Sequence, residues 1–193
     1  MNTPGHIVLN LAFIGKWDTR AKSLPMVIGS ALPDIPIMVF YLYQRFYSGV
    51  SDLVIWSIVY YIPVWQNLFD SFHSLPLAIA GALTFYYLGY LFVSRIFVGM
   101  TLHSIVDFFL HADDGHQHFF PFINYRFESP ISYWDPQHFG IVGAGMELLV
   151  VMIASIVILK RENPAWVRVM IYFIWFFYTA ATTFLILYMN GIV

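Results

Sequence analysis

Two long apolar segments constrain this chain more than any other feature of its sequence. Residues 139–159 (FGIVGAGMELLVVMIASIVIL) and 166–189 (WVRVMIYFIWFFYTAATTFLILYM) are each long enough to cross a bilayer as a helix, which takes about 20 apolar residues. Only 10% of the 193 residues are charged, and the mean hydropathy is +0.70. Ordinary soluble domains carry roughly 25% charged residues. The composition therefore excludes a water-soluble domain and predicts a single integral membrane domain over residues 1–193.

The remaining apolar segments predict further helices of the same bundle. They cover residues 6–15, 26–32, 35–46, 53–69, 75–93 and 95–111. The first two form a short N-terminal helical hairpin inside the bundle. We therefore predict an all-α fold, a polytopic helical membrane bundle with about five to six spans plus that hairpin. A loop of about 27 residues follows, from Ala112 to His138, and a loop of that length is usually functional or disordered.

Basic residues gather at one predicted end of this bundle. Helix directions were counted from His6, with the chain reversing at Asp34. Eight of the nine Lys and Arg residues then share one end, while Arg126 lies at the other: Lys16, Arg20, Lys22, Arg45, Arg95, Lys160, Arg161 and Arg168. Excess Lys and Arg mark the cytoplasmic side, so the histidine-rich end is expected to face the non-cytoplasmic side.

Net charge and residue composition exclude some classes of partner and ligand. A net charge of −2 with sparse basic residues leaves no footprint for nucleic acid. The sequence contains no cysteine, which excludes a thiolate metal site. The membrane lipid bilayer is the expected surrounding.

The segment TLHSIVDFFLHADDGHQHFF (101–120) is unusually polar for this chain. His103, Asp107 and His111 follow at i, i+4 and i+8, so on a helix they share one face. One metal ion could then bind an imidazole and a carboxylate from successive turns. The same predicted end of the bundle also carries His6, Asp34, Asp70 and His73. Imidazole and carboxylate ligands without sulfur suit a divalent metal such as zinc, manganese or iron, and zinc is expected first.

Several of these residues also have simpler interpretations. A His103–Asp107 pair is as compatible with a structural hydrogen bond or a proton relay as with a metal. Asp34 suits the N-cap of a helix over IPIMVF, and Asp70 suits the cap of a helix near Leu75. The weaker metal candidates are His116 and His118, expected to be solvated in the loop, His138, expected at the headgroups, and Glu147, expected to pair within the bundle.

Four short motifs in chain order resemble a known family. They are TPGHIVLNLAF, VIGSALPDIP, DSFHS and GMTLHSIVDFFLH, spread over residues 3 to 111. Together they resemble the membrane-bound metal-dependent hydrolases and are more remotely similar to the zinc-dependent phospholipase C family, whose fold is all-helical. Each motif alone is weak, and four in the right order are moderately specific.

The resemblance implies a set of metal ligands. Asp34, His73, His103 and Asp107 would bind one metal, and Asp107 would bridge to a second metal that His6 also holds. A third metal in the phospholipase pattern would take its first histidine from His111, His116 or His118. The sequence departs from the pattern at Val142, where a glutamate is expected, and at Pro36, where a second aspartate is common.

The leading functional prediction is a metal-dependent hydrolase of a lipid or lipid-linked phosphoester at the non-cytoplasmic membrane face. Its metal ligands would be drawn from His6, Asp34, His73, His103, Asp107 and His111, with Asp34 doubling as the general base. The alternative is a non-enzymatic accessory or assembly subunit of a larger membrane complex, with a structural His/Asp metal site. An ion transporter ranks third, because no internal repeat and no matching pair of broken helices is visible.

Overall fold

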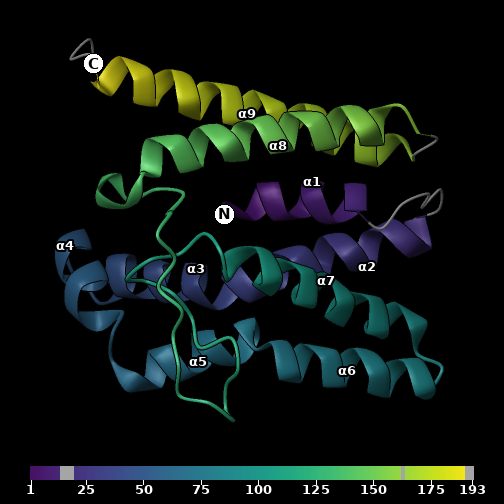
Figure 1. The fold of residues 1–193 in the computed structure, drawn as a ribbon, viewed down its shortest axis with the longest axis horizontal. Helices are drawn as coiled ribbons and strands as arrows, with labels where there is room; N and C mark the ends of the chain where they lie inside the picture. Colours follow the sequence, from purple (N-terminus) through teal and green to yellow (C-terminus); the bar gives the residue numbers. More distant parts are fainter. Residues whose placement is uncertain (14–19, 162–163, 190–193) are drawn as a thin grey trace.

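The protein is a bundle of helices with one long loop laid across it (Figure 1). The computed structural model describes residues 1–13, 20–161 and 164–189, and no strand occurs in these ranges. The α-helices are α1 (Thr3–Phe13), α2 (Arg20–Ala31), α3 (Ile35–Leu42), α4 (Asp52–Val54), α5 (Pro63–His73), α6 (Leu75–Tyr87), α7 (Leu91–Asp107), α8 (Gly140–Leu159) and α9 (Ala165–Met189). Two 3₁₀ turns, η1 (Leu32–Asp34) and η4 (Pro136–His138), and two π-helical segments, η2 (Tyr43–Tyr47) and η3 (Ile55–Val59), complete them. The all-α prediction is confirmed.

The number of candidate spans is smaller than the five to six predicted. In the described residues, Ser23–Tyr47 and Gly140–Leu159 are long and apolar enough to cross a membrane, and α5 with α6 would add a third as one span bent by 46°. Several other helices are too short. At 1.5 Å per residue α7 reaches only about 26 Å, against a hydrocarbon core of about 30 Å. The predicted span 35–46 is part of the longer candidate span Ser23–Tyr47, and the predicted span 53–69 is interrupted by a turn at residues 60–62.

The predicted reversal of the chain at Asp34 is wrong. η1 continues α2 into α3 and η2, so that Ser23–Tyr47 forms one candidate span with Asp34 near its middle. Pro33 and Pro36 start new helical turns, where their missing amide hydrogens are tolerated. Arg45 therefore lies beyond Asp34 on the same helix, not back at the end where α2 begins. Lys16 lies outside the described residues.

The predicted N-terminal helical hairpin is present as α1 beside α2, and both pack against α7. Asn10 of α1 joins the three helices, since its amide nitrogen donates to Ser30 Oγ at 2.8 Å and to the Gly99 carbonyl at 3.1 Å. Gly29 and Gly99 lie against each other where α2 crosses α7. A side chain at Gly29 would overlap the Ile96 carbonyl, so these glycines set how closely the two helices approach.

Candidate metal centre

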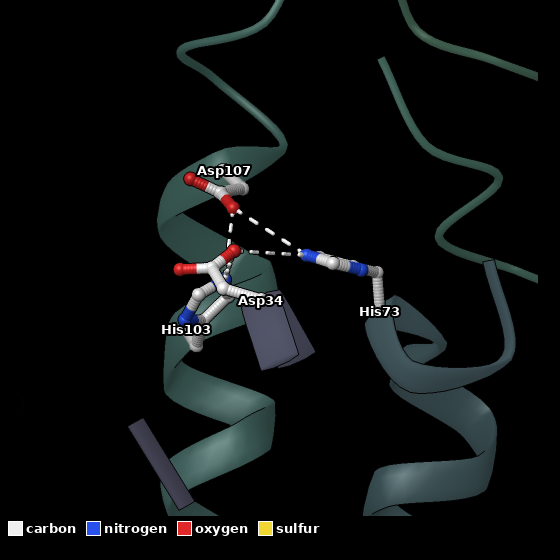
Figure 2. A group of neighbouring side chains, drawn as sticks. All are labelled: Asp34, His73, His103 and Asp107. Carbon is white, nitrogen blue, oxygen red and sulfur yellow. Dashed lines mark ion pairs between the residues drawn. The ribbon is translucent and has the colours of Figure 1, made fainter. Parts of the chain in front are cut away.

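Four side chains from three helical segments converge on one point in the bundle. Asp34 ends η1, His73 ends α5, and His103 and Asp107 lie one turn apart on α7. One ligand atom of each lies within 4.8 Å of the others, and Figure 2 shows the four groups pointing toward one another. These predicted residues therefore form a group that could hold a metal ion. Apart from Asp34, they are buried.

Backbone carbonyls fix which ring nitrogens of the two histidines face the carboxylates. His103 Nδ1 lies 2.7 Å from the Ser30 carbonyl, and His73 Nδ1 lies 2.9 Å from the Phe69 carbonyl. A carbonyl only accepts, so each Nδ1 carries the proton and each neutral ring has a bare lone pair on Nε2. Both Nε2 atoms are buried and have no hydrogen-bond partner.

Lone pairs on nitrogen and on carboxylate oxygen therefore face each other across a short gap. The separations are 2.9 Å from His103 Nε2 to Asp107 Oδ2, 3.5 Å from it to Asp34 Oδ1, and 3.8 Å from His73 Nε2 to each carboxylate. Ligands at about 2.0–2.2 Å in a zinc tetrahedron stand roughly 3.4 Å apart. A backbone carbonyl that accepts from Nδ1, as those of Ser30 and Phe69 do, is also a usual outer partner of a metal-ligating histidine. The residues present thus fit a small divalent cation, while their geometry does not choose which one.

The second oxygen of Asp107 faces a different set of groups. His6 Nε2 lies 2.9 Å from Oδ1, His111 Nε2 lies 3.5 Å from it, and the Met1 amino group donates to it at 2.8 Å. His6 and His111, the two remaining predicted ligands, therefore meet the opposite oxygen of the shared carboxylate. They do not join the four-residue group.

His111 reaches this position by a route that differs from the prediction. α7 ends at Asp107, so His111 lies past the helix and not on its third successive turn. Its Nδ1 is 3.0 Å from Asp114 Oδ2, which also accepts from the Trp134 indole. Burial opposes a charge on His111, yet Asp107 raises the pKa of His111 to about 9. The neighbouring carboxylate therefore favours the protonated form of His111.

The loop histidines are buried, so the prediction of solvated side chains is wrong. His116 stacks on His73 with ring centroids 3.8 Å apart, and His118 packs against Phe108. Burial, reinforced by His73, holds the pKa of His116 well below its usual range, and burial lowers the pKa of His118 to about 4. Both rings are therefore neutral at pH 7.

Asp70 fixes this loop and does not cap α6. Its carboxylate accepts from Arg126 Nη2 at 2.6 Å, from Nη1 at 3.1 Å and from the Gln117 amide at 3.0 Å. Ser74 caps α6 by accepting from the Leu77 amide. Because Asp70 lies one turn before His73 on α5, the ion pair holds the loop beside a candidate ligand.

His138 and Glu147 lie apart from the four-residue group, and Asp34, a member of that group, does not cap a helix. Asp34 makes no side-chain cap bond to α3, and its Oδ2 instead accepts from Thr3. His138 pairs with Asp135 at 2.6 Å in a second, more exposed group with Asp113. Glu147 pairs within the bundle, as expected, by accepting from Tyr178 at 2.7 Å.

A cavity of about 640 Å³ opens onto the four-residue group. Part of its lining belongs to or adjoins that group: Thr3, Asp34, His111, Asp114 and His116. Another part is the aromatic wall, which we define as Ile37, Met38, Tyr41, Trp56, Tyr60 and Tyr61 from α3 and from η3 with the turn that follows it. Binding pockets for small molecules have volumes of about 300–1,000 Å³, so the cavity is large enough for a ligand to reach Asp34.

A family model matches residues 1–187, nearly the whole chain. The chain belongs to the YdjM inner membrane protein family. The apolar candidate spans agree with membership of this YdjM family. No curated protein and no solved structure matches the chain.

Sequence reasoning missed several residues of this YdjM family member that support the centre. Asp114 orients His111, and Arg126 pairs with Asp70. Asp114 was recognisable in the sequence, because it lies three residues after His111 in HADDGH. Arg126 gave no comparable signal, since its partner is 56 residues away.

Proposed function

We propose that the protein is a metal-dependent hydrolase of a lipid or lipid-linked phosphoester, working at the non-cytoplasmic face of the membrane. One observation carries the proposal. The bare Nε2 atoms of His73 and His103 face the carboxylates of Asp34 and Asp107 beside an open cavity. A catalytic metal site keeps a ligand position open, and Asp34 is the one member of the group that lines the cavity.

The residues of the chain divide the chemical work between them. His73, His103, Asp34 and Asp107 would hold the ion, with Asp107 positioned to share a second one with His6 and His111. When bound, such an ion makes water a better nucleophile near neutral pH and polarises a phosphoryl oxygen. Zinc is the metal proposed first. The cavity gives Asp34 access to a bound substrate.

Asp34 is proposed as the general base because its two oxygens have different surroundings. Oδ1 faces the two histidines, whereas Oδ2 accepts from Thr3. The Thr3 hydroxyl fixes the carboxylate plane, and the partly exposed side chain can accept a proton from water in the cavity. A general base positioned in this way contributes about 10²–10⁴-fold to a rate.

The proposal that the centre faces the non-cytoplasmic side rests on the basic residues at the ends of the helices. The beginning of α7 and the end of α8 both lie at the right of Figure 1, and they carry or adjoin Arg95, Lys160 and Arg161. The candidate centre lies at the other end of α7. Basic residues favour the cytoplasmic side, although Arg45 and Arg126 lie away from this basic end.

Metal content of the detergent-purified protein is the first test, followed by a screen of lipid phosphoesters. We expect bound divalent metal and turnover, both lost in a His103→Ala/Asp107→Ala variant. Asp34→Asn should lower kcat by about 10²–10⁴-fold. Asp52→Asn is the matched control, because Asp52 is an exposed carboxylate outside the cavity. Turnover that survives loss of both His103 and Asp107 would disprove the proposal.

The second candidate function is an accessory or assembly subunit of a larger membrane complex, with a structural metal. The observation in its favour is that the group offers four ligands, the number that fills a structural zinc site. Co-purification of the protein in a stoichiometric complex, with bound metal and no turnover of any phosphoester, would favour this function.

A further inference from the structure

The aromatic wall continues one helix face that starts at the metal centre. Asp34, Ile37, Met38 and Tyr41 follow at i, i+3, i+4 and i+7, the spacing of neighbours along one side of a helix. All four line the cavity. From Asp34 to Tyr41 this face is about 10 Å long.

The wall is held rigidly from behind. Tyr41 stacks on Trp56 with ring centroids 5.6 Å apart and planes 12° apart, which joins α3 to η3. Buried Phe40 packs against Trp56 and Tyr60 on the other side of α3. The apolar surface turned to the cavity is therefore preformed.

Part of the aromatic wall is exposed at the surface of the protein. Met38 is 56% exposed, Trp56 44% and Tyr61 48%. Met38 lies within the candidate span Ser23–Tyr47, whose outer surface meets hydrocarbon in a membrane. In a membrane, the exposed end of the cavity would therefore open toward hydrocarbon, while its other end reaches Asp34 of the metal centre.

The charges of the cavity favour an apolar occupant along this wall. None of the described residues that line it is Lys or Arg. The nearby Arg126 uses both terminal nitrogens on Asp70 and the Gly115 carbonyl. An anionic group therefore has no partner on the wall, and the positive groups of the cavity, the Met1 amino group and His111, lie beside Asp107 at the metal centre.

We infer that the aromatic wall binds one hydrocarbon chain of the substrate, which enters sideways from the bilayer and leads its phosphoryl group to Asp34. This inference rests on the proposed function and adds the part of the substrate that the wall selects. Each methylene laid on the wall should tighten binding roughly four-fold, until the chain extends past Tyr41. Longer chains then gain nothing further.

The first experiment compares butyl and dodecyl 4-nitrophenyl phosphate as substrates of the metal-loaded protein. Trp56→Ala should lower kcat/KM for the dodecyl ester by about ten-fold or more and leave the butyl ester within about two-fold. Phe46→Ala is the control, because Phe46 in η2, directly after α3, is 75% exposed and does not line the cavity. Equal losses with both esters, or no loss with either, would overturn the inference.

The second experiment requires no turnover. A dodecyl phosphonate with a terminal diazirine resists hydrolysis and is photo-crosslinked to the metal-loaded protein in detergent. We expect label within residues 37–61, competed by unlabelled dodecyl phosphonate and blocked by Met38→Trp. Labelling spread evenly over the lipid-facing side of α8, without competition, would refute the chain site. Specific labelling without turnover would refute the hydrolase alone, and turnover without specific labelling would refute the chain site alone.

Discussion

Two buried carboxylate oxygens in this bundle, Asp107 Oδ2 and Glu147 Oε1, have opposite surroundings. Asp107 Oδ2 faces the Nε2 lone pairs of His73 and His103, while Oδ1 of the same carboxylate accepts from the Met1 amino group. Glu147 of α8 accepts three hydrogen bonds on Oε1, from the Asn2 amide, the Asn2 side chain and the Tyr178 hydroxyl. Hydrogen-bond donors stabilise a buried carboxylate without a metal ion. A nitrogen lone pair that faces a carboxylate oxygen stabilises it only when a cation or a proton lies between the two atoms. The comparison indicates that the surroundings of a carboxylate, more than its burial, mark a metal site.

The first residues of the chain, at the start of α1, contact both Asp107 and Glu147. The Met1 amino group donates to Asp107, and the next residue, Asn2, donates to Glu147. His6, one turn further along, reaches Asp107 at 2.9 Å. The Glu147 cluster therefore fixes the position from which α1 meets the candidate centre.

The largest expected effect is a loss of bound metal, which should follow from changes at Asp107 but not from changes at Glu147. His103→Ala/Asp107→Ala should lose all bound divalent metal, because one imidazole and the shared carboxylate disappear together. Glu147→Gln should keep the metal, since its partners are hydrogen-bond donors. Plasma mass spectrometry on protein of equal helicity, checked by circular dichroism, measures both. Loss of metal in Glu147→Gln would erase the distinction between the two regions.

The next effect concerns the ion pair beside the centre. Asp70 is fully buried and Arg126 is its partner at 2.6 Å. Arg126→Met should destabilise the protein by about 3–5 kcal/mol, because it leaves a buried carboxylate unpaired. Arg45→Met is the control: its pair with Asp52 is about half exposed, so its loss should cost under about 1 kcal/mol. Thermal unfolding in detergent compares the two, and equal shifts would show that burial of Asp70 contributes nothing.

Particular residues show how far the sequence could predict this structure. The pairing of His103 with Asp107 follows from their i, i+4 spacing, which a helix converts into proximity whatever the tertiary fold. The proximity of Asp34 and His73 was predicted from short motifs in a fixed order along the chain. The structure places both residues in the four-residue group. These predictions needed little more than local geometry and order along the chain.

Other features depended on information that is not local. The prediction that the chain reverses at PDIP rests on proline as a helix breaker. Pro33 and Pro36 instead occupy first-turn positions, so the helix continues. The burial of His116 depends on Arg126, ten residues later, which binds Asp70 on α5 and the Gly115 carbonyl. Hydropathy also overcounted the spans, because it measures apolar content and does not detect breaks such as the turn at residues 60–62 between η3 and α5.

A third effect tests how the helix crossing aligns the centre. Gly29→Ala should destabilise the protein by about 1–3 kcal/mol, because the new methyl group overlaps the Ile96 carbonyl of α7. It should also weaken metal binding, since α2 leads to Asp34 and α7 carries His103. Gly145→Ala in α8 is the control, with nothing within 4 Å of its added methyl group. It should stabilise the protein by about 0.5–1 kcal/mol. Unchanged metal affinity in Gly29→Ala would show that the ligands adjust to a shifted helix.

The smallest expected effect lies on the Glu147 side of the comparison. Tyr178→Phe removes one of three donors to Oε1 and should destabilise the protein by about 1 kcal/mol, with metal content unchanged. The two bonds from Asn2 remain, so α1 should keep its place and His6 its contact with Asp107. Unfolding in detergent and metal titration of the same samples measure the two quantities. A fall in metal affinity would mean that Glu147 needs all three donors to hold α1, and that the two carboxylates act as one unit through the first turn of that helix.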